Sequence, residues 1–148
     1  MTSQERLERL QIGPFWRLLG IEVRAFETGS VTLSMPVTEQ IMQSYGVVHG
    51  GALATLVDAA VGVSVQTTLE ENEATTTIDL QVMYDRPVEA GVLTAIGTII
   101  KRGGTVVFGE AKIYDEKKRL VVHGSATYMI LEHARWARSK KTVVGNEE

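Results

Sequence analysis

Hydrophobic residues follow two different periods along the chain, and these periods divide it into helices and strands. Leucines recur at helical spacing among charged residues over 3–12, and a further helical turn is expected to end at Gly20. Residues 21–27 and 30–37 have the pattern of strands, and the Thr-Gly pair between them is typical of a hairpin turn. The N-terminal part therefore predicts two short helices followed by a β-hairpin.

The segment from about Gly50 to Leu69 is the most apolar part of the chain. Its length, alanines and leucines favour one helix, although its three alternating valines also suit a strand. Because the segment is hydrophobic nearly all round, we expect it to be enclosed by the rest of the protein. Its apolar run is too short to span a membrane.

The second half of the chain has the pattern of four further strands, near residues 74–84, 92–102, 105–115 and 120–131. The breaks between them are short, which favours antiparallel neighbours, because parallel crossovers need a dozen or more residues. Gly97, Gly109 and Gly124 lie among larger apolar residues on three successive strands. They would let a helix approach a curved sheet closely, or they mark bulges. The pattern predicts an α+β domain in which an antiparallel sheet wraps one long helix.

Composition limits the class of protein. The 148 residues fit a single domain, 1–148, with a core at about 15–131 and a peripheral or disordered tail at 132–148. The net charge of -3 argues against a nucleic-acid partner. The absence of cysteine excludes a disulfide framework and a thiolate nucleophile. The N-terminus lacks the apolar stretch of a signal peptide, so we expect a cytoplasmic protein without a membrane partner.

Asp58 is the most unusual residue of the apolar helix. Its helical neighbours carry no charge: they are Ala54, Thr55, Val61 and Gly62. A buried carboxylate without partners is costly, and these small neighbours would leave room for a ligand or water. Asp58 is therefore a candidate general base or nucleophile. The alternative is a structural carboxylate that backbone amides or a distant arginine satisfy.

His49-Gly50-Gly51 directly precede this helix. Glycines allow a ligand to approach the backbone, and free N–H groups at a helix N-terminus can bind an anion or an oxyanion. An ordinary helix start with a structural histidine is the alternative. Asp58 lies roughly 12 Å from Gly50 along one helix, too far for both to act on one carbonyl. A shared reaction would need two subunits related by a two-fold axis, which would form two identical sites.

Three stretches of this sequence resemble hotdog-fold thioesterases of the phenylacetic-acid-degradation (PaaI-like) group. The central one is GVVHGGALATLVDAAVGVSV, in which His49 and Asp58 match a family motif whose acidic residue follows the histidine by nine positions. The resemblance continues through TTIDLQVMYDRPVEAG and KRGGTVVFGEAKIYDEKKRLVVHGSATY. It covers roughly residues 15–131.

The resemblance implies a hotdog fold that dimerises through its sheet and often forms homotetramers. It implies hydrolysis of an acyl-CoA or aryl-CoA thioester to CoA and a carboxylic acid, with no metal and no cofactor. The Gly50 N–H would polarise the thioester carbonyl, and His49 would shape the loop. Asp58 of the neighbouring subunit would activate water or attack the carbonyl. Thr77 stands where relatives have a Ser or Thr that orients the water, unless it is an ordinary strand residue.

One position departs from the family pattern. Many relatives have Asn six residues before the histidine, where it helps bind the substrate carbonyl region or the loop, and this chain has Gln43 there. Gln43 could keep the same role on a longer arm, or it is an exposed loop residue.

CoA carries phosphates, so a local cationic patch is expected. Lys101 and Arg102, followed by Gly103, are the candidates for CoA binding, together with Gly51 at the helix start. Solvated surface charge is the alternative for both cations. Met42, Tyr45, Met83 and Tyr84 are candidates for the acyl pocket or for the core. Two competing functions remain: a non-catalytic acyl-CoA-binding module, and a hotdog dehydratase, whose different motif is absent here.

Overall fold

The computed structural model describes residues 1–132, and its elements follow the predicted order. Of the tail predicted at 132–148, Glu132 is the last residue of the final strand, and residues 133–148 lie outside the described residues. The elements are α1 (Ser3–Gln11), α2 (Pro14–Leu19), β1 (Glu22–Glu27), β2 (Ser30–Pro36), the short 3-10 helix η1 (Glu39–Ile41), α3 (Gly50–Gln66), β3 (Glu73–Tyr84), β4 (Val92–Arg102), β5 (Val106–Tyr114) and β6 (Leu120–Glu132).

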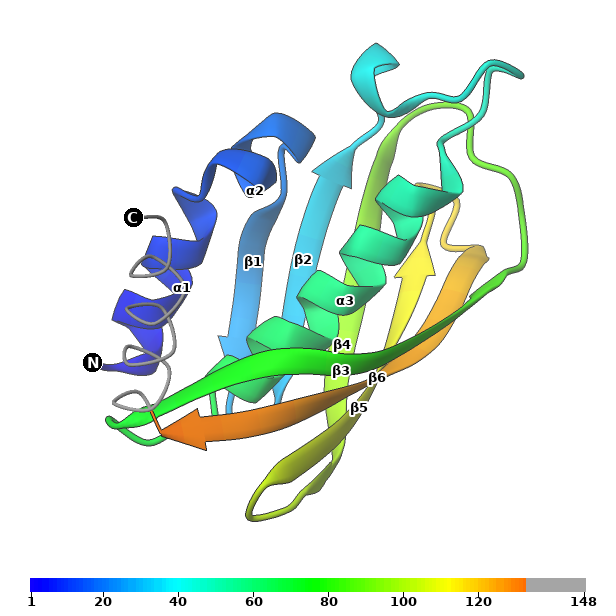
Figure 1. The fold of residues 1–148 in the computed structure, drawn as a ribbon. Helices are drawn as coiled ribbons and strands as arrows, with labels where there is room; N and C mark the ends of the chain where they lie inside the picture. The colour runs from blue at the N-terminus through cyan, green and yellow to red at the C-terminus, as the bar shows by residue number, and fades with distance from the viewer. Residues whose placement is uncertain (133–148) are drawn as a thin grey trace, which may run out of the picture.

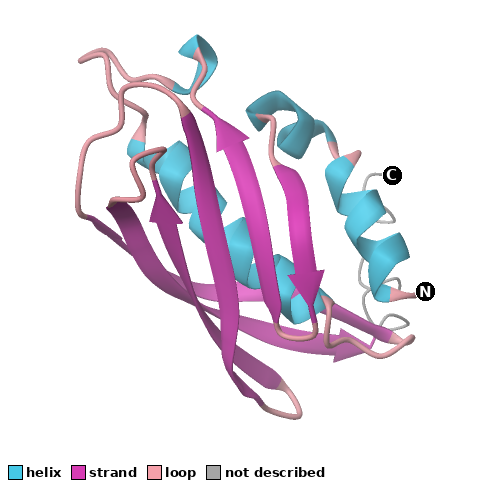
Figure 2. Ribbon diagram, turned by 180° about the vertical axis from the view of Figure 1, so that it is seen from behind, coloured by secondary structure: helices cyan, strands magenta, loops and turns pink. Residues whose placement is uncertain are grey.

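The strands form one antiparallel sheet in the order β1-β2-β4-β5-β6-β3. The sheet curves around α3, while α1 and α2 lie beside β1 at the open side (Figure 1). Figure 2 shows the opposite face of the sheet, with α3 behind it. This arrangement is the predicted hotdog fold, and it leaves β1 and β3 as the two edges of the sheet.

α3 is buried along most of its length, as its all-round hydrophobicity predicted. Glycines on β4, β5 and β6 let the sheet come close to it. A Cβ at Gly97, Gly109 or Gly124 would collide with α3 atoms of Ala60, Val61 and Val57, in that order. The predicted close approach of helix and sheet is confirmed, and it holds the middle of α3 firmly against the strands.

The N-terminal helices are anchored near the C-terminal end of α3. A capping box between Thr2 and Glu5 begins α1, and the left-handed Gly20 ends α2. Arg6 of α1 donates hydrogen bonds to the carbonyl oxygens of Glu70 and Glu73, at 2.5 and 3.1 Å, just before and at the start of β3. α1 and α2 therefore form a wall that faces both α3 and β3. No helix within residues 1–132 is long and apolar enough to cross a membrane.

Candidate active site

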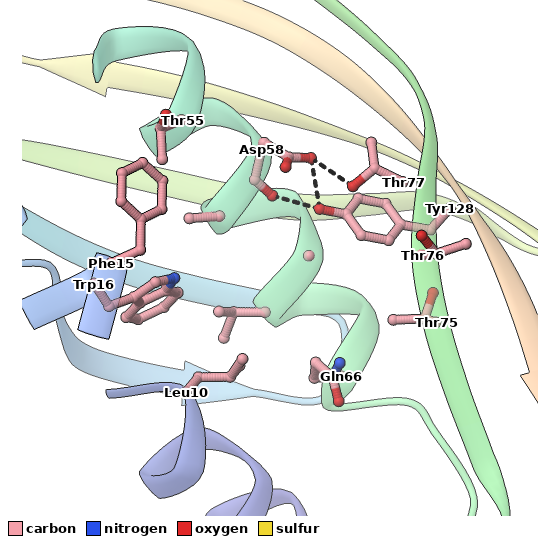
Figure 3. Close-up of a pocket in the computed structure, with 13 residues that line it drawn as sticks. Leu10, Phe15, Trp16, Thr55, Asp58, Gln66, Thr75, Thr76, Thr77 and Tyr128 are labelled. Carbon is pink, nitrogen blue, oxygen red and sulfur yellow. Dashed lines mark hydrogen bonds between the residues drawn. The ribbon is translucent and has the colours of Figure 1, made fainter. Parts of the chain in front are cut away.

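Asp58 lies on the side of α3 that faces β3 and β6, and two hydroxyl groups hold one of its carboxylate oxygens. Thr77 Oγ1 donates to Asp58 Oδ1 at 3.0 Å, and Tyr128 Oη donates to the same atom at 2.6 Å (Figure 3). Within residues 1–132, no donor is bonded to Oδ2. The carboxylate is therefore fixed through one oxygen, and the other is free to act on a ligand or water.

The sheet explains why these two hydroxyl groups converge. Thr77 and Tyr128 are directly opposite each other on β3 and β6. The next residue, Ile78, has no partner in the β3–β6 register, because the register shifts between Thr77 and Asp79. Bulges of this kind increase local twist and re-aim neighbouring side chains. The bulge therefore lies where β3 turns its hydroxyl group toward α3.

Tyr128 contacts the Asp58 carboxylate, and the sequence did not predict this contact. Its side chain is 6% exposed, and its hydroxyl group also lies 2.8 Å from the backbone carbonyl of Asp58. Burial raises the pKa of the Tyr128 phenol, and the nearby charge of Asp58 raises it further. The phenol therefore keeps its proton and acts as a hydrogen-bond donor. Sequence spacing gave no sign of this contact, because it joins residues 70 positions apart.

An open cavity of about 320 Å³ lies beside the carboxylate. One wall comes from the N-terminal helices and is apolar, with Leu10, Phe15 and Trp16 (Figure 3). The opposite wall is polar and consists of consecutive threonines, 75–77, of β3. Met42, Tyr45, Met83 and Tyr84, the four candidates for the acyl pocket, do not line this cavity.

The first turn of α3 offers a backbone donor. His49 is the N-cap residue, and its Nδ1 accepts a hydrogen bond from the Gly51 N–H at 2.8 Å. The Gly51 N–H is therefore engaged, and a Cβ at Gly51 would meet the His49 ring at 3.0 Å, so the predicted role of Gly51 in substrate binding stays a prediction. The Gly50 N–H donates to no residue in the described part of the chain. Gly50 thus presents a free N–H at the positive end of the helix dipole.

Two contacts fix the backbone around this donor. Tyr84, the last residue of β3, donates from its hydroxyl group to the Gly50 carbonyl oxygen at 2.8 Å. On the other side of the turn, the His49 N–H donates to the Ile41 carbonyl oxygen at 2.8 Å. The backbone on both sides of the Gly50 N–H is therefore held in place, and the N–H itself has no partner among the described residues.

Gln43 shapes the loop before His49. Its side-chain Oε1 accepts from the backbone N–H of Tyr45 at 2.6 Å, and its backbone N–H donates to the Val47 carbonyl oxygen at 2.8 Å. These bonds fold residues 43–47 into a tight turn, in which Gly46 has a positive φ of 81°. The predicted contact of Gln43 with a substrate carbonyl stays a prediction.

Three of the predicted CoA-binding residues, Lys101, Arg102 and Gly103, lie at the far end of β3 from Gly50. Arg102 forms an ion pair with Glu73 at 2.8 Å and donates to the Gly103 carbonyl oxygen at 2.5 Å, whereas Lys101 is exposed. Glu73 and Tyr84 are the two ends of β3, a span of roughly 36 Å at the usual rise per residue. One chain therefore does not bring Arg102 close to Gly50.

Of the predicted catalytic residues, only Thr77 lies next to Asp58 in the same chain. Gly50, His49 and Gln43 gather at the N-terminal end of α3, about two helical turns away from Asp58. The described residues contain no group of three or more His, Cys, Asp or Glu side chains that could hold a metal ion.

The family follows from comparison with known proteins. Residues 45–122 match the model of the Thioesterase superfamily. The chain belongs to this superfamily. The matched segment contains both the first turn of α3 and Asp58, so the two candidate halves of the site lie within the family's own region.

Individual relatives agree with this assignment. The chain is 28% identical over 132 residues to the medium/long-chain acyl-CoA thioesterase YigI of Salmonella typhimurium, covering 79% of this chain and 85% of that protein. A thioesterase structure from Haemophilus influenzae superposes with a TM-score of 0.81 at 29% identity, covering 87% and 90% of the two chains. The PaaI protein of Escherichia coli shares the fold, with a TM-score of 0.79, 21% identity and coverage of 86% and 91%. The predicted hotdog-fold thioester hydrolase is confirmed.

Proposed function

We propose that this protein hydrolyses an acyl-CoA thioester to CoA and a carboxylic acid, with Asp58 as the reacting carboxylate. The observation that carries the proposal is the state of that carboxylate: Oδ1 is held by two hydroxyl groups, and Oδ2 is free beside a cavity. A general base or nucleophile needs a free oxygen and a side chain that is held still. Asp58 has both properties.

The thioester carbonyl would be bound by a Gly50 N–H that comes from a second copy of the chain. An oxyanion needs a donor within about 3 Å, and Gly50 of the same chain lies roughly 12 Å from Asp58 along α3. Two chains related by a two-fold axis would pair the donor of each with the carboxylate of the other. This arrangement makes the site a property of the homodimer.

The β3 edge supports such a dimer. β3 pairs only with β6, so one side of a 12-residue strand lacks a strand partner among the described residues. Long uncovered edges invite pairing with another chain. Large apolar side chains on this strand are exposed: Ile78 by 50%, Leu80 by 37%, Met83 by 62% and Tyr84 by 53%. Antiparallel pairing of two β3 strands would cover this edge.

Such pairing also suggests a register. Thr77 contacts Asp58, and Tyr84 contacts Gly50. A two-fold axis near Leu80 and Gln81, midway between Thr77 and Tyr84, would set the Asp58 side of one chain opposite the Gly50 side of the other. Arg102 of the partner subunit would then lie closer to Gly50 than Arg102 of the same chain does. This supports the predicted contribution of Lys101, Arg102 and Gly103 to CoA binding.

The chemistry would proceed from the free oxygen in either of two ways. As a general base, Oδ2 takes a proton from water while the water oxygen bonds to the thioester carbonyl carbon. The Gly50 N–H then stabilises the oxyanion, and the C–S bond breaks as CoA leaves and recovers the proton. As a nucleophile, Oδ2 itself bonds to the carbonyl carbon and expels CoA, and water hydrolyses the resulting anhydride. In both cases the products are CoA and the carboxylic acid.

The cavity supports an acyl group of medium size. It runs along α3 from Asp58 to Gln66 and has Leu10, Phe15 and Trp16 on its apolar wall. Apolar walls with a few polar groups are typical of small-molecule sites. YigI is named as an enzyme for medium and long acyl chains, and we extend medium-chain acyl-CoA to this chain as the first substrates to test.

Replacing Asp58 with Asn tests the proposal. The amide keeps the shape of the side chain but cannot take a proton or attack, so we expect turnover to fall by about a thousandfold or more. Release of free thiol from a panel of CoA thioesters measures turnover, and binding of CoA measures the intact pocket. Glu110→Gln, which changes an exposed acid on the outer face of β5, is the matched control and should keep full activity.

Two outcomes would contradict the proposal. Comparable turnover by Asp58→Asn would remove this residue from the chemistry. Tight binding of acyl-CoA by the unmodified protein, with no hydrolysis across the panel, would favour the non-catalytic binding module. In an active protein, single turnover in ¹⁸O-labelled water separates the two routes, because label appears in the Asp58 carboxylate only after direct attack.

A further inference from the structure

We infer that Tyr128 is a positioning residue that ties down Oδ1 of Asp58 and so selects Oδ2 as the reacting oxygen. This inference deepens the proposed function and rests on it. Tyr128 Oη lies 2.6 Å from Oδ1, the shorter of the two contacts to that atom. Hydrogen bonds from a hydroxyl group to a carboxylate are short and strong, so this contact restrains rotation of the carboxylate.

Gly62 of α3 leaves the space that the Tyr128 hydroxyl group occupies. Gly62 lies one turn after Asp58, and a Cβ at this position would meet the Tyr128 Oη at 2.5 Å and the ring carbon beside it at 3.0 Å. A glycine in a helix interior is destabilising by roughly 1 kcal/mol relative to alanine. The space that Gly62 leaves is filled by the one side chain that reaches the Asp58 carboxylate from β6.

Among the residues that the structure describes, Tyr128 is the only other titratable group lining the cavity beside the carboxylate. The residues that line the cavity come from α1, α2, α3, β3 and β6, and among them only Asp58 and Tyr128 titrate. β2, β4 and β5 pack on the remaining faces of α3 with buried apolar residues and glycines. Because the phenol stays protonated, its hydroxyl group remains a hydrogen-bond donor to Oδ1.

Replacing Tyr128 with Phe removes this donor and keeps the ring. We expect kcat to fall by about ten- to a hundredfold, the range that a hydrogen bond to a charged group is worth. KM should change little, since the ring still lines the cavity. A loss confined to kcat is expected when the reacting carboxylate loses its restraint, whereas a distorted cavity would raise KM as well. Tyr114→Phe, on β5 and away from the cavity, is the matched control.

Gly62→Ala tests the same contact from the helix side. The added methyl group would push the Tyr128 hydroxyl group away, so this variant should also lower kcat and leave KM nearly unchanged. Combined with Tyr128→Phe it should cause little further loss, because both changes break one contact.

An unchanged kcat in Tyr128→Phe, measured on a protein that Asp58→Asn inactivates, would overturn this inference and leave the proposed function standing. A fall in kcat together with a rise in KM and a loss of thermal stability would also overturn it in favour of a structural role. Activity that survives Asp58→Asn would overturn the proposed function itself.

Discussion

The first turn of α3 and its middle differ in how their polar groups are held. At the first turn, the cap residue His49 and Gly51 satisfy each other, and the Gly50 N–H is left free at a surface. In the middle, Asp58 is partly buried and held through Oδ1 by groups from two strands. One end offers an open donor, and the other offers a restrained carboxylate.

This difference shows what each part of the helix can do alone. A free N–H at a helix N-terminus binds negative charge, and a restrained carboxylate can take a proton or attack. Hydrolysis of a thioester needs both on one carbonyl. Because α3 keeps Gly50 and Asp58 of one chain apart, we infer that the site is assembled from two chains. The α3 helix of each chain would supply the Gly50 donor to one site and the Asp58 carboxylate to the other.

Among changes to the first turn of α3, Gly50→Pro should have the largest effect on kcat. Proline lacks the N–H and is well tolerated at the first position of a helix. The preceding residue, His49, already has the extended backbone that proline requires, with φ -60° and ψ 134°. We expect kcat to fall by about a hundredfold or more, the usual loss when one oxyanion donor is removed. Thiol release at saturating substrate measures it.

Gly50→Ala is the matched control for that variant. It keeps the N–H and adds a Cβ that would lie 3.3 Å from the Tyr84 ring, a tight contact that a small movement of the ring relieves. Its activity should stay within a few-fold of the unmodified protein. Equal losses in the alanine and proline variants would mean that the added bulk, rather than the missing donor, lowers activity.

A smaller effect, on the free energy of unfolding at alkaline pH, should come from Tyr128, which contacts the middle of α3. The pKa of Tyr128 is raised above its ordinary value of 10.0 by burial and by the charge of Asp58. Below pH 10 the phenol is protonated in both the folded and unfolded chain, so it adds no pH dependence. Above pH 10 the unfolded phenol loses its proton while the folded one keeps it. The free energy of unfolding should therefore fall by about 1 kcal/mol per pH unit.

Denaturant unfolding at pH 9, 10 and 11 measures this loss. Tyr128→Phe should show a smaller decline with pH than Tyr114→Phe, which removes a phenol outside the cavity. The same decline in both variants would contradict a raised pKa of the Tyr128 phenol in the folded chain.

Most of the fold was predictable because its elements have clear periods. The all-round apolar pattern of α3 and the short breaks between strands gave the helix, the strands and the antiparallel sheet within a few residues. Asp58 was predictable for the same reason, as an acid in an apolar helix. Tyr128 was not, because its partner lies 70 positions away and only the β3–β6 register brings its ring to α3. The apolar wall of the cavity was missed as well, since the packing of α1 and α2 on α3 leaves no local pattern.

Subunit complementation tests the two-chain site most directly. Asp58→Asn and Gly50→Pro chains carrying different tags are coexpressed, and the mixed dimers are purified through both tags. Each mixed dimer would have one site with both changes and one with neither, so we expect about half of the unmodified activity from two individually inactive variants. Mixed dimers as inactive as their parents would contradict the account, because Gly50 and Asp58 would then have to act within one chain.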